Sequence, residues 1–213
     1  MNNFKPFYRR NLPHFQQNGA TYFITTRLYG SLPKDVIIKI SKDNAEKISA
    51  IKLSNKNDSE KELLIDEQHR RYFGLFDKYL ESNPNGNHWL KNENVAKIIM
   101  DALHFRDGKQ YELICYTIMS NHIHLVFTVL NEDINLYTIL QRLKQFTASQ
   151  ANKILNKTGS FWQEESYDRV VRNEGELTRI ISYVLNNPVK IGLVENWRDY
   201  PFSYVNQMFS EQL

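Results

Sequence analysis

The stretch that decides the fold is YELICYTIMSNHIHLVFTVL, residues 111–130. It contains two runs rich in β-branched and aromatic residues, 111–119 and 122–130, separated only by Ser120 and Asn121. Runs of this composition are typical of strands, and so short a separation predicts an antiparallel pair joined by a tight turn. The sequence therefore predicts a β-hairpin at the centre of the chain.

The second run carries two histidines, His122 and His124. Residues two apart in a strand point to the same side, so the two imidazoles should project side by side. The opposite, core-facing side would be covered by alternate apolar residues, namely Ile123, Leu125 and Phe127. Two adjacent imidazoles on a rigid strand form half of a divalent metal site. The same spacing also fits a pair of histidines without a ligand, so the strand alone leaves both interpretations open.

The rest of the chain supplies the other elements of a single domain, residues 1–213. We expect strands at 19–30 and 168–172, and helices at 92–108, 135–156 and 174–188, the last one ended by Pro188. The order strand, helix, strand, strand, helix, strand is that of the ferredoxin-like, split βαβ fold. The predicted class is therefore α+β: an antiparallel sheet with helices on one face and an appended C-terminal helix.

Residues 31–90 do not belong to this order, and we interpret them as an insertion after the first strand. DVIIKI (35–40) is compatible with a short strand, and SNKNDSEKE (54–62) with a polar loop. Residues 65–82 have the apolar spacing of a helix. The sequence indicates no role for this insertion.

The composition excludes several classes of protein. With 41% hydrophobic and 24% charged residues, the chain is globular rather than disordered. A single cysteine, Cys115, excludes an internal disulfide framework and a multi-cysteine zinc site. No apolar stretch approaches the roughly 20 residues that span a bilayer, and the N-terminus lacks a signal-peptide core. We expect a cytoplasmic location and no membrane partner.

Positive charge is unevenly distributed although the net charge is only +3. No acidic residue precedes Asp35, whereas Arg9 and Arg10 lie in that segment. Residues 138–157 carry Arg142, Lys144, Lys153 and Lys157 and no acid. Such segments attract polyanions, nucleic acid above all, although each is also compatible with a merely solvated face.

A second set of chemically useful side chains lies in the last predicted helix. Tyr183 and Asn187 are four residues apart, so they share one helical face with Cβ atoms about 5–6 Å apart. An amide oxygen suits a hard cation such as Mg²⁺ or Mn²⁺, and a deprotonated phenol is a nucleophile. A core tyrosine and a helix-ending asparagine remain the alternative.

Four motifs resemble the REP-associated tyrosine transposases, which are single-tyrosine transposases with a histidine–hydrophobe–histidine motif. They are YTIMSNHIHLVF (116–127), SFWQEESYDRVVR (160–172), ISYVLNNPVKIGLV (181–194) and WRDYPFSY (197–204). The resemblance covers roughly residues 10–30 and 95–204. The family's central motif usually reads Met-Pro-Asn-His-x-His, whereas this chain has Ser120 at the proline position.

The resemblance implies a nuclease and strand-transfer site. His122, His124 and Asn187 would hold Mg²⁺ or Mn²⁺, and Tyr183 would attack single-stranded hairpin DNA of the repetitive extragenic palindrome type, giving a 5′-phosphotyrosine intermediate. The predicted phosphate contacts are Arg9, Arg10, Arg142, Lys144 and Lys153, and Trp162 is a candidate for stacking on an unpaired base. DNA of this kind would associate the protein with the nucleoid.

Two other functions remain open at this point. One is a catalytically silent protein that binds hairpin DNA on the same fold. The other is a metal-dependent hydrolase, which normally needs several more ligands than the remaining histidines, His14, His69, His88 and His104, provide. Whether the protein is a monomer or a homodimer, and whether Tyr183 works with its own histidines or a partner's, is not indicated by the sequence.

Overall fold

A five-stranded antiparallel sheet with the strand order β6-β3-β5-β4-β7 organises the chain. In this computed structural model, residues 7–9, 13–15, 19–130 and 135–210 are described, the first two segments by their backbone alone. The strands of the sheet are β3 (Thr21–Arg27), β4 (Tyr111–Ile118), β5 (His122–Val129), β6 (Tyr167–Val170) and β7 (Ser203–Val205). A separate two-stranded ladder pairs β1 (Phe7–Arg9) with β2 (Pro13–Phe15).

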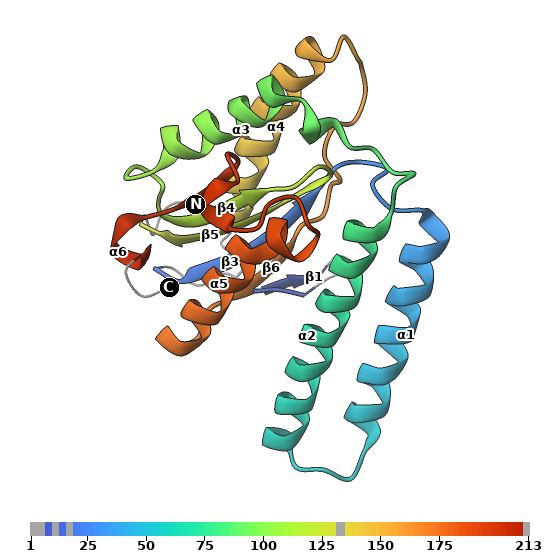
Figure 1. Cartoon of the computed structure of the whole chain (residues 1–213). Coiled ribbons are helices and arrows are strands. Elements are labelled where there is room, and N and C mark those ends of the chain that lie inside the picture. The colour runs from blue at the N-terminus through green and yellow to red at the C-terminus, as the bar shows by residue number, and fades with distance from the viewer. Residues whose placement is uncertain (1–6, 10–12, 16–18, 131–134, 211–213) are drawn as a thin grey trace, which may run out of the picture. The chain divides into compact units, whose positions relative to one another are not determined.

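The helices cover both faces of the sheet (Figure 1). On one face, α3 (Glu93–Arg106) packs beside α4 (Leu136–Ile154), and on the other α5 (Glu174–Lys190) packs against β4, β5 and β7. Shorter helical turns are η1 (Trp89–Lys91), η2 (Trp197–Asp199) and α6 (Gln207–Ser210). The order β3-α3-β4-β5-α4-β6 is the predicted ferredoxin-like order, with β7 added at the β4 edge and α5 appended.

The central hairpin forms as its sequence predicts. The amide of Met119 donates to the carbonyl of His122 at 2.9 Å, which closes the tight turn between β4 and β5. Ile123, Leu125 and Phe127 are all at most 1% exposed and belong to the main core, together with the inner faces of α3 and α4. Burial of these three side chains fixes the register, since a slip by one residue would turn them out of the core.

Residues 30–87 form a compact unit separate from residues 1–29 and 88–213. The unit is a pair of packed helices, α1 (Lys34–Leu53) and α2 (Asp58–Ser82). The strand expected at 35–40 is wrong, because these residues lie in α1. Val36 is half-buried and Ile40 is buried, and their i, i+4 spacing places both on one face of a helix.

The second helix of the insertion begins seven residues earlier than the expected residue 65. The reason is a capping box that the sequence already contained. The Asn57 side chain accepts from the Glu60 amide at 2.9 Å, and the Glu60 carboxylate accepts from the Asn57 amide at 3.1 Å. The polar segment expected to be a loop is therefore largely the first turns of α2.

Two further expectations are corrected. The helix α5 does not end at Pro188 but continues to Lys190. Proline lacks an N–H group, so one hydrogen bond of the helix is lost. The next turn still forms, because the Ile191 amide donates to the Asn187 carbonyl. In the predicted helices 92–108 and 135–156, the spacing of apolar residues places Phe105 and Phe146 on the core-facing sides, but the two rings are 67% and 47% exposed. Cations lie over both rings: Lys109 Nζ is 3.9 Å from the Phe105 centroid and the Arg106 guanidinium 5.8 Å from that of Phe146.

Candidate active site on the β5–α5 face

The two histidines of β5 lie on the sheet face that α5 covers. His122 and His124 are at most 1% exposed and alternate with the core residues of the same strand. Register places Arg27 opposite His122 and Thr25 opposite His124 on the neighbouring strand β3. The side-by-side projection predicted from strand alternation is confirmed, and the rings are 4.7 Å apart at their centroids.

Each imidazole has its Nδ1 atom held by a neighbouring polar group. His122 Nδ1 lies 2.7 Å from Asn121 Oδ1, and His124 Nδ1 lies 2.7 Å from Thr25 Oγ1. Because an amide oxygen only accepts, the proton of His122 resides on Nδ1 and leaves Nε2 with its lone pair. Contacts of this kind orient metal-binding histidines and fix their tautomers.

The two Nε2 atoms face each other at 3.1 Å. Two lone pairs at this distance repel unless a proton or a cation lies between them. Two nitrogens that bind one ion at about 2.1 Å each, as adjacent ligands, are about 3.0–3.4 Å apart. The observed separation is that of an N–H···N hydrogen bond between the two rings, and it also fits two ligands of one ion.

The helix α5 brings Tyr183 to this pair. Its ring lies 5.5 Å from that of His124, centroid to centroid and edge to face. Phe23 of β3 stacks on His124 at 5.8 Å and meets the edge of Tyr183 at 6.1 Å, so it holds both rings from one side. Tyr183 is half-buried. Residues some 60 positions apart in the sequence thus share one site.

Asn187 lies one helical turn beyond Tyr183 and is 1% exposed. Its Nδ2 atom donates to the Tyr183 carbonyl at 3.0 Å, while its Oδ1 atom is buried without a hydrogen-bond partner among the described residues. A buried amide oxygen without a partner is costly, and a ligand that binds it would offset that cost. Asn187 therefore does not serve merely to end the helix.

The start of α5 is fixed by a second set of contacts. Asn173 accepts from the Glu176 amide at 2.9 Å, and the Glu176 carboxylate accepts from the Arg172 amide at 2.9 Å. The same carboxylate pairs with Arg169 of β6. These contacts anchor the helix to the sheet at its N-terminus and so determine where its later residues meet β5.

Ser120, which stands where the related motif has proline, has its own partner. His88 Nδ1 lies 2.8 Å from Ser120 Oγ, and the Leu90 amide donates to the Ser120 carbonyl at 3.1 Å. The turn is therefore tied to the segment that enters α3. This departure from the motif changes how the hairpin turn is held and leaves the histidines in place.

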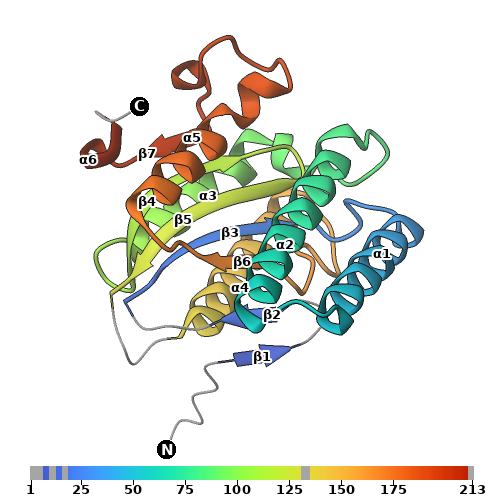
Figure 2. The same ribbon diagram turned by 90° about the horizontal axis from the view of Figure 1, so that it is seen from below.

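Two of the predicted phosphate-binding residues lie across the sheet from the histidines. Arg142 and Lys153 are exposed on α4, which lies on the opposite side of the sheet from α5 (Figures 1 and 2). Arg10 lies outside the described residues, and of Arg9 only the backbone is described. DNA contact by these four residues stays a prediction.

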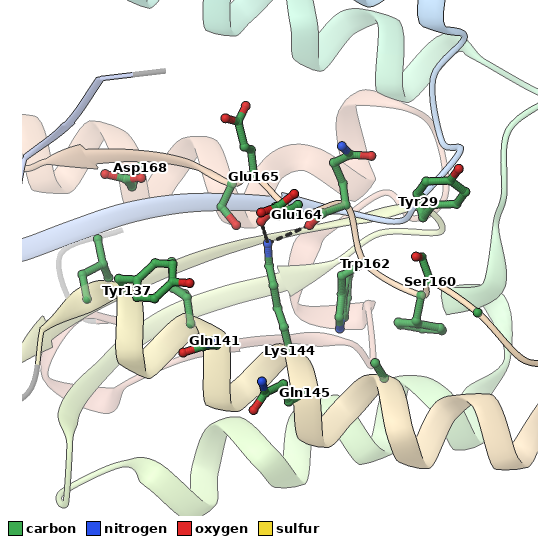
Figure 3. A pocket seen from close by; sticks show the side chains of 17 residues that line it. Tyr29, Tyr137, Gln141, Lys144, Gln145, Ser160, Trp162, Glu164, Glu165 and Asp168 are labelled. Carbon is green, nitrogen blue, oxygen red and sulfur yellow. Dashed lines mark hydrogen bonds between the residues drawn. The ribbon is translucent and has the colours of Figure 1, made fainter. Parts of the chain in front are cut away.

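Lys144 and Trp162 are engaged inside the protein. Lys144 Nζ donates to the carbonyls of Gln163 and Glu164 at 2.9 and 3.0 Å, as Figure 3 shows. Trp162 is 8% exposed, and its Nε1 atom donates to Thr147 Oγ1 at 2.8 Å. The structure thus places Trp162 at the edge of the core, and its stacking on an unpaired base stays a prediction.

Sequence reasoning missed the residues that support the site: Phe23, Thr25 and Asn121. Strand alternation would have put Phe23 and Thr25 on one face of β3, but the register that sets Thr25 opposite His124 is a property of the folded sheet. Asn121 adjoins the histidine motif, so its proximity was the one available signal.

No helix among the described residues combines the length and the apolar composition that a membrane span requires. The comparison with known families gives a positive result. Residues 87–187 match the model of the IS200-like transposases, and this segment contains His122, His124, Tyr183 and Asn187.

Two curated proteins are similar to part of the chain. The REP-associated tyrosine transposase of Escherichia coli is 26% identical over 96 residues, which cover 45% of this chain and 54% of that protein. A Haemophilus influenzae protein that carries the same family name is 31% identical over 102 residues, covering 44% and 58%. The chain thus matches little more than half the length of these relatives.

A solved structure of a REP-associated tyrosine transposase bound to a REP hairpin has the same fold. The match has a TM-score of 0.52 at 17% identity and covers 92% of this chain and 80% of the other. Residues 87–187 therefore carry the pattern of the IS200-like transposases, and the resemblance of this chain to the REP-associated tyrosine transposases is confirmed.

Proposed function

We propose that this protein is a transposase-type enzyme that cleaves and rejoins single-stranded hairpin DNA, with Tyr183 as nucleophile and a divalent metal ion as cofactor. The observation that carries the proposal is the convergence of His124 and Tyr183, with ring centroids 5.5 Å apart, on the face where His122 also lies. The matches to IS200-like and REP-associated transposases support the same reaction class.

The residues present fit a hard divalent cation. The His122 and His124 Nε2 atoms are spaced as two ligands of one ion, and the buried Asn187 Oδ1 atom supplies an oxygen without another partner among the described residues. Two imidazoles and one amide oxygen are compatible with either Mg²⁺ or Mn²⁺. Bound there, the ion would supply Lewis-acid polarisation of a phosphodiester.

The chain's own residues account for the bond changes. The Tyr183 oxygen would attack the phosphorus of a phosphodiester, forming a tyrosine–phosphate bond to the 5′ side while the 3′ oxygen leaves and takes up a proton as a hydroxyl. Attack by a 3′-hydroxyl on the phosphotyrosine reverses these changes, so joining needs no external energy source. Phe23, packed against both Tyr183 and His124, would hold the nucleophile in place.

A catalytically silent protein that binds hairpin DNA is the second candidate. The matches to the two curated transposases cover little more than half of those proteins' length, so a chain that keeps the fold and binds hairpin DNA without cleaving it is the alternative to test. The full constellation of His122, His124, Tyr183 and Asn187 favours the enzyme, because a binding protein has no need of a buried, unpartnered amide oxygen.

The test is a denaturing gel of the purified full chain with 5′- and 3′-labelled single-stranded hairpins, with and without Mg²⁺ or Mn²⁺. A metal-dependent covalent protein–DNA band should form and should be lost in Tyr183→Phe and His122→Ala. Tyr79→Phe, which alters a half-buried tyrosine on α2 of the insertion, is the matched control and should keep the band. Hairpin binding without any covalent band would establish the silent protein instead.

A further inference from the structure

A pocket separate from the histidine site lies between α4 and the segment that leads into β6. Its volume is about 600 Å³, and it is formed by residues 136–148 of α4, by residues 159–168 and by Tyr29 (Figure 3). None of His122, His124, Tyr183 and Asn187 lines it. A cavity of this size can hold a nucleotide-sized ligand.

The charges around the pocket disfavour an anion. Glu164, Glu165 and Asp168 line it, and Lys144 is the one cation among its lining residues. The Lys144 ammonium is already bound by two backbone carbonyls, and burial, followed by the nearby Arg27 charge, lowers its pKa to about 7. A phosphate would therefore meet three carboxylates and one cation that two carbonyls already bind, so the part of a ligand that enters this pocket is not an anion.

The remaining lining is aromatic and amide. Tyr29 and Tyr137 are 48% and 40% exposed, and Gln141 and Gln145 lie one turn apart on α4. Flat rings favour stacking of another ring, and amide side chains both donate and accept hydrogen bonds, as the edges of nucleobases require. Carboxylates accept hydrogen bonds from exocyclic amino groups.

A buried group in the lining also calls for a partner. Ser166 is 7% exposed, lines the pocket and has a buried Oγ atom without a hydrogen-bond partner among the described residues. A hydroxyl left in this state is costly in the absence of a ligand or water. This feature is expected of a pocket that is completed by a polar ligand.

We propose that this pocket receives one unpaired, amino-bearing nucleobase of the DNA strand, which stacks on the Tyr137 ring and is hydrogen-bonded by the Gln141 and Gln145 amides and the carboxylates. The proposal rests on the proposed DNA function and adds a base-recognition site separate from the catalytic residues. Thymine, which lacks an exocyclic amino group, would be disfavoured. Lys144, by holding the Gln163 and Glu164 carbonyls, would shape the pocket rather than contact a phosphate.

The experiment measures equilibrium binding of the full chain to labelled hairpins with unpaired flanks, in which one flanking nucleotide at a time is replaced by an abasic site. At one position the abasic site should weaken binding about tenfold or more, the typical effect of losing one stacked base. At that same position thymine should bind more weakly than adenine, cytosine or guanine. The Gln141→Ala/Gln145→Ala double variant should lose most of this base dependence.

The matched control is Ser149→Ala, an exposed position on the same helix outside the pocket lining, which should keep the full base dependence. Hairpin binding with no base-dependent position, or a dependence that the double variant leaves unchanged, would overturn the pocket assignment alone. If free deoxynucleosides bind saturably but hairpin binding does not depend on any flanking base, the pocket is assigned to a small molecule instead. A chain that binds none of the oligonucleotides would overturn the DNA function itself, and the inference with it.

Discussion

At the scale of single residues, the candidate site contains a buried oxygen atom without a hydrogen-bond partner among the described residues. The histidine Nδ1 atoms have partners in Asn121 and Thr25, whereas Asn187 Oδ1 has none among the described residues. The sequence predicted all four candidate site residues, because the histidine and tyrosine–asparagine spacings are local. It could not predict Phe23 and Thr25, whose roles depend on the pairing of β3 with β5.

Replacing Asn187 separates a metal-binding role from a structural one. Asn187→Leu keeps the branching of the side chain at Cγ and removes the buried oxygen that has no partner among the described residues. We expect the free energy of unfolding to change by no more than about 1 kcal/mol, because the lost amide bond is offset by removal of an unsatisfied polar atom. Mn²⁺ affinity, measured by isothermal titration calorimetry, should fall at least about tenfold. A large loss of stability with unchanged Mn²⁺ affinity would show that the residue is structural.

Lys144 should make stability depend on pH. Burial, then the neighbouring Arg27 charge, lowers its folded-state pKa from 10.5 to about 7, whereas the unfolded chain keeps the ordinary value. Between these two values the unfolded state binds more protons, so the free energy of unfolding rises with pH. We expect a gain of at least about 1 kcal/mol between pH 7 and pH 10, measured by urea denaturation.

The Lys144→Met variant is the control for this dependence, since it removes the titrating group and keeps much of the side chain's length. Its stability should vary less over the same pH range than that of the parent. If parent and variant show the same slope, another group is responsible and the ammonium of Lys144 is not destabilised in the folded protein.

At the scale of elements, the sequence predicted the secondary structure correctly where the residue composition and the spacing of the apolar residues indicated the same type of element. The β4–β5 hairpin, α3 and α4 lie where the sequence predicts them. The errors have physical causes: the β-branched run at 35–40 adopts the helix that packs on α2, and Pro188 lies so near the end of α5 that the last turn still forms. The Asn57–Glu60 capping box was a readable signal that the strand-and-loop interpretation overlooked.

The two ends of the helical insertion are joined by backbone contacts that leave no room for a side chain at Gly86. The Asn87 amide donates to the Gly30 carbonyl at 3.4 Å, the Asn83 side chain donates to the Ser31 carbonyl at 2.8 Å, and a Cβ atom on Gly86 would lie 2.4 Å from that same carbonyl oxygen. Gly86→Ala should destabilise the unit by about 2 kcal/mol, measured by chemical denaturation followed by circular dichroism.

Gly74→Ala is the matched substitution. Gly74 lies inside α2 with nothing within 4 Å of an added Cβ, so alanine should stabilise the helix by about 0.5–1 kcal/mol. The two glycine variants should thus shift stability in opposite directions. Equal effects would mean that the closure at Gly86 does not constrain the insertion.

At the scale of the whole molecule, the sheet separates two groups of predicted site residues within the unit formed by residues 1–29 and 88–213. The histidines, Tyr183 and Asn187 lie on the α5 side, whereas exposed Arg142 and Lys153 lie on α4 across the sheet. The sequence of α4, which contains no acidic residue, predicted a basic helix. It did not predict which of the basic side chains are exposed, because that depends on which side of the helix packs against the sheet. Lys144, for example, lies on the packed side and donates hydrogen bonds to backbone carbonyls within the protein.

The most direct measurement of the central claim identifies the amino acid that becomes joined to DNA. The full chain is incubated with hairpin DNA and Mn²⁺, the DNA is trimmed with nuclease, and the protein is digested with trypsin for mass spectrometry. Residues 180–190, between Arg179 and Lys190, form one tryptic peptide whose single tyrosine is Tyr183. The account predicts a 5′-phosphonucleotide mass on this peptide alone, and its appearance on a peptide containing another tyrosine would contradict it.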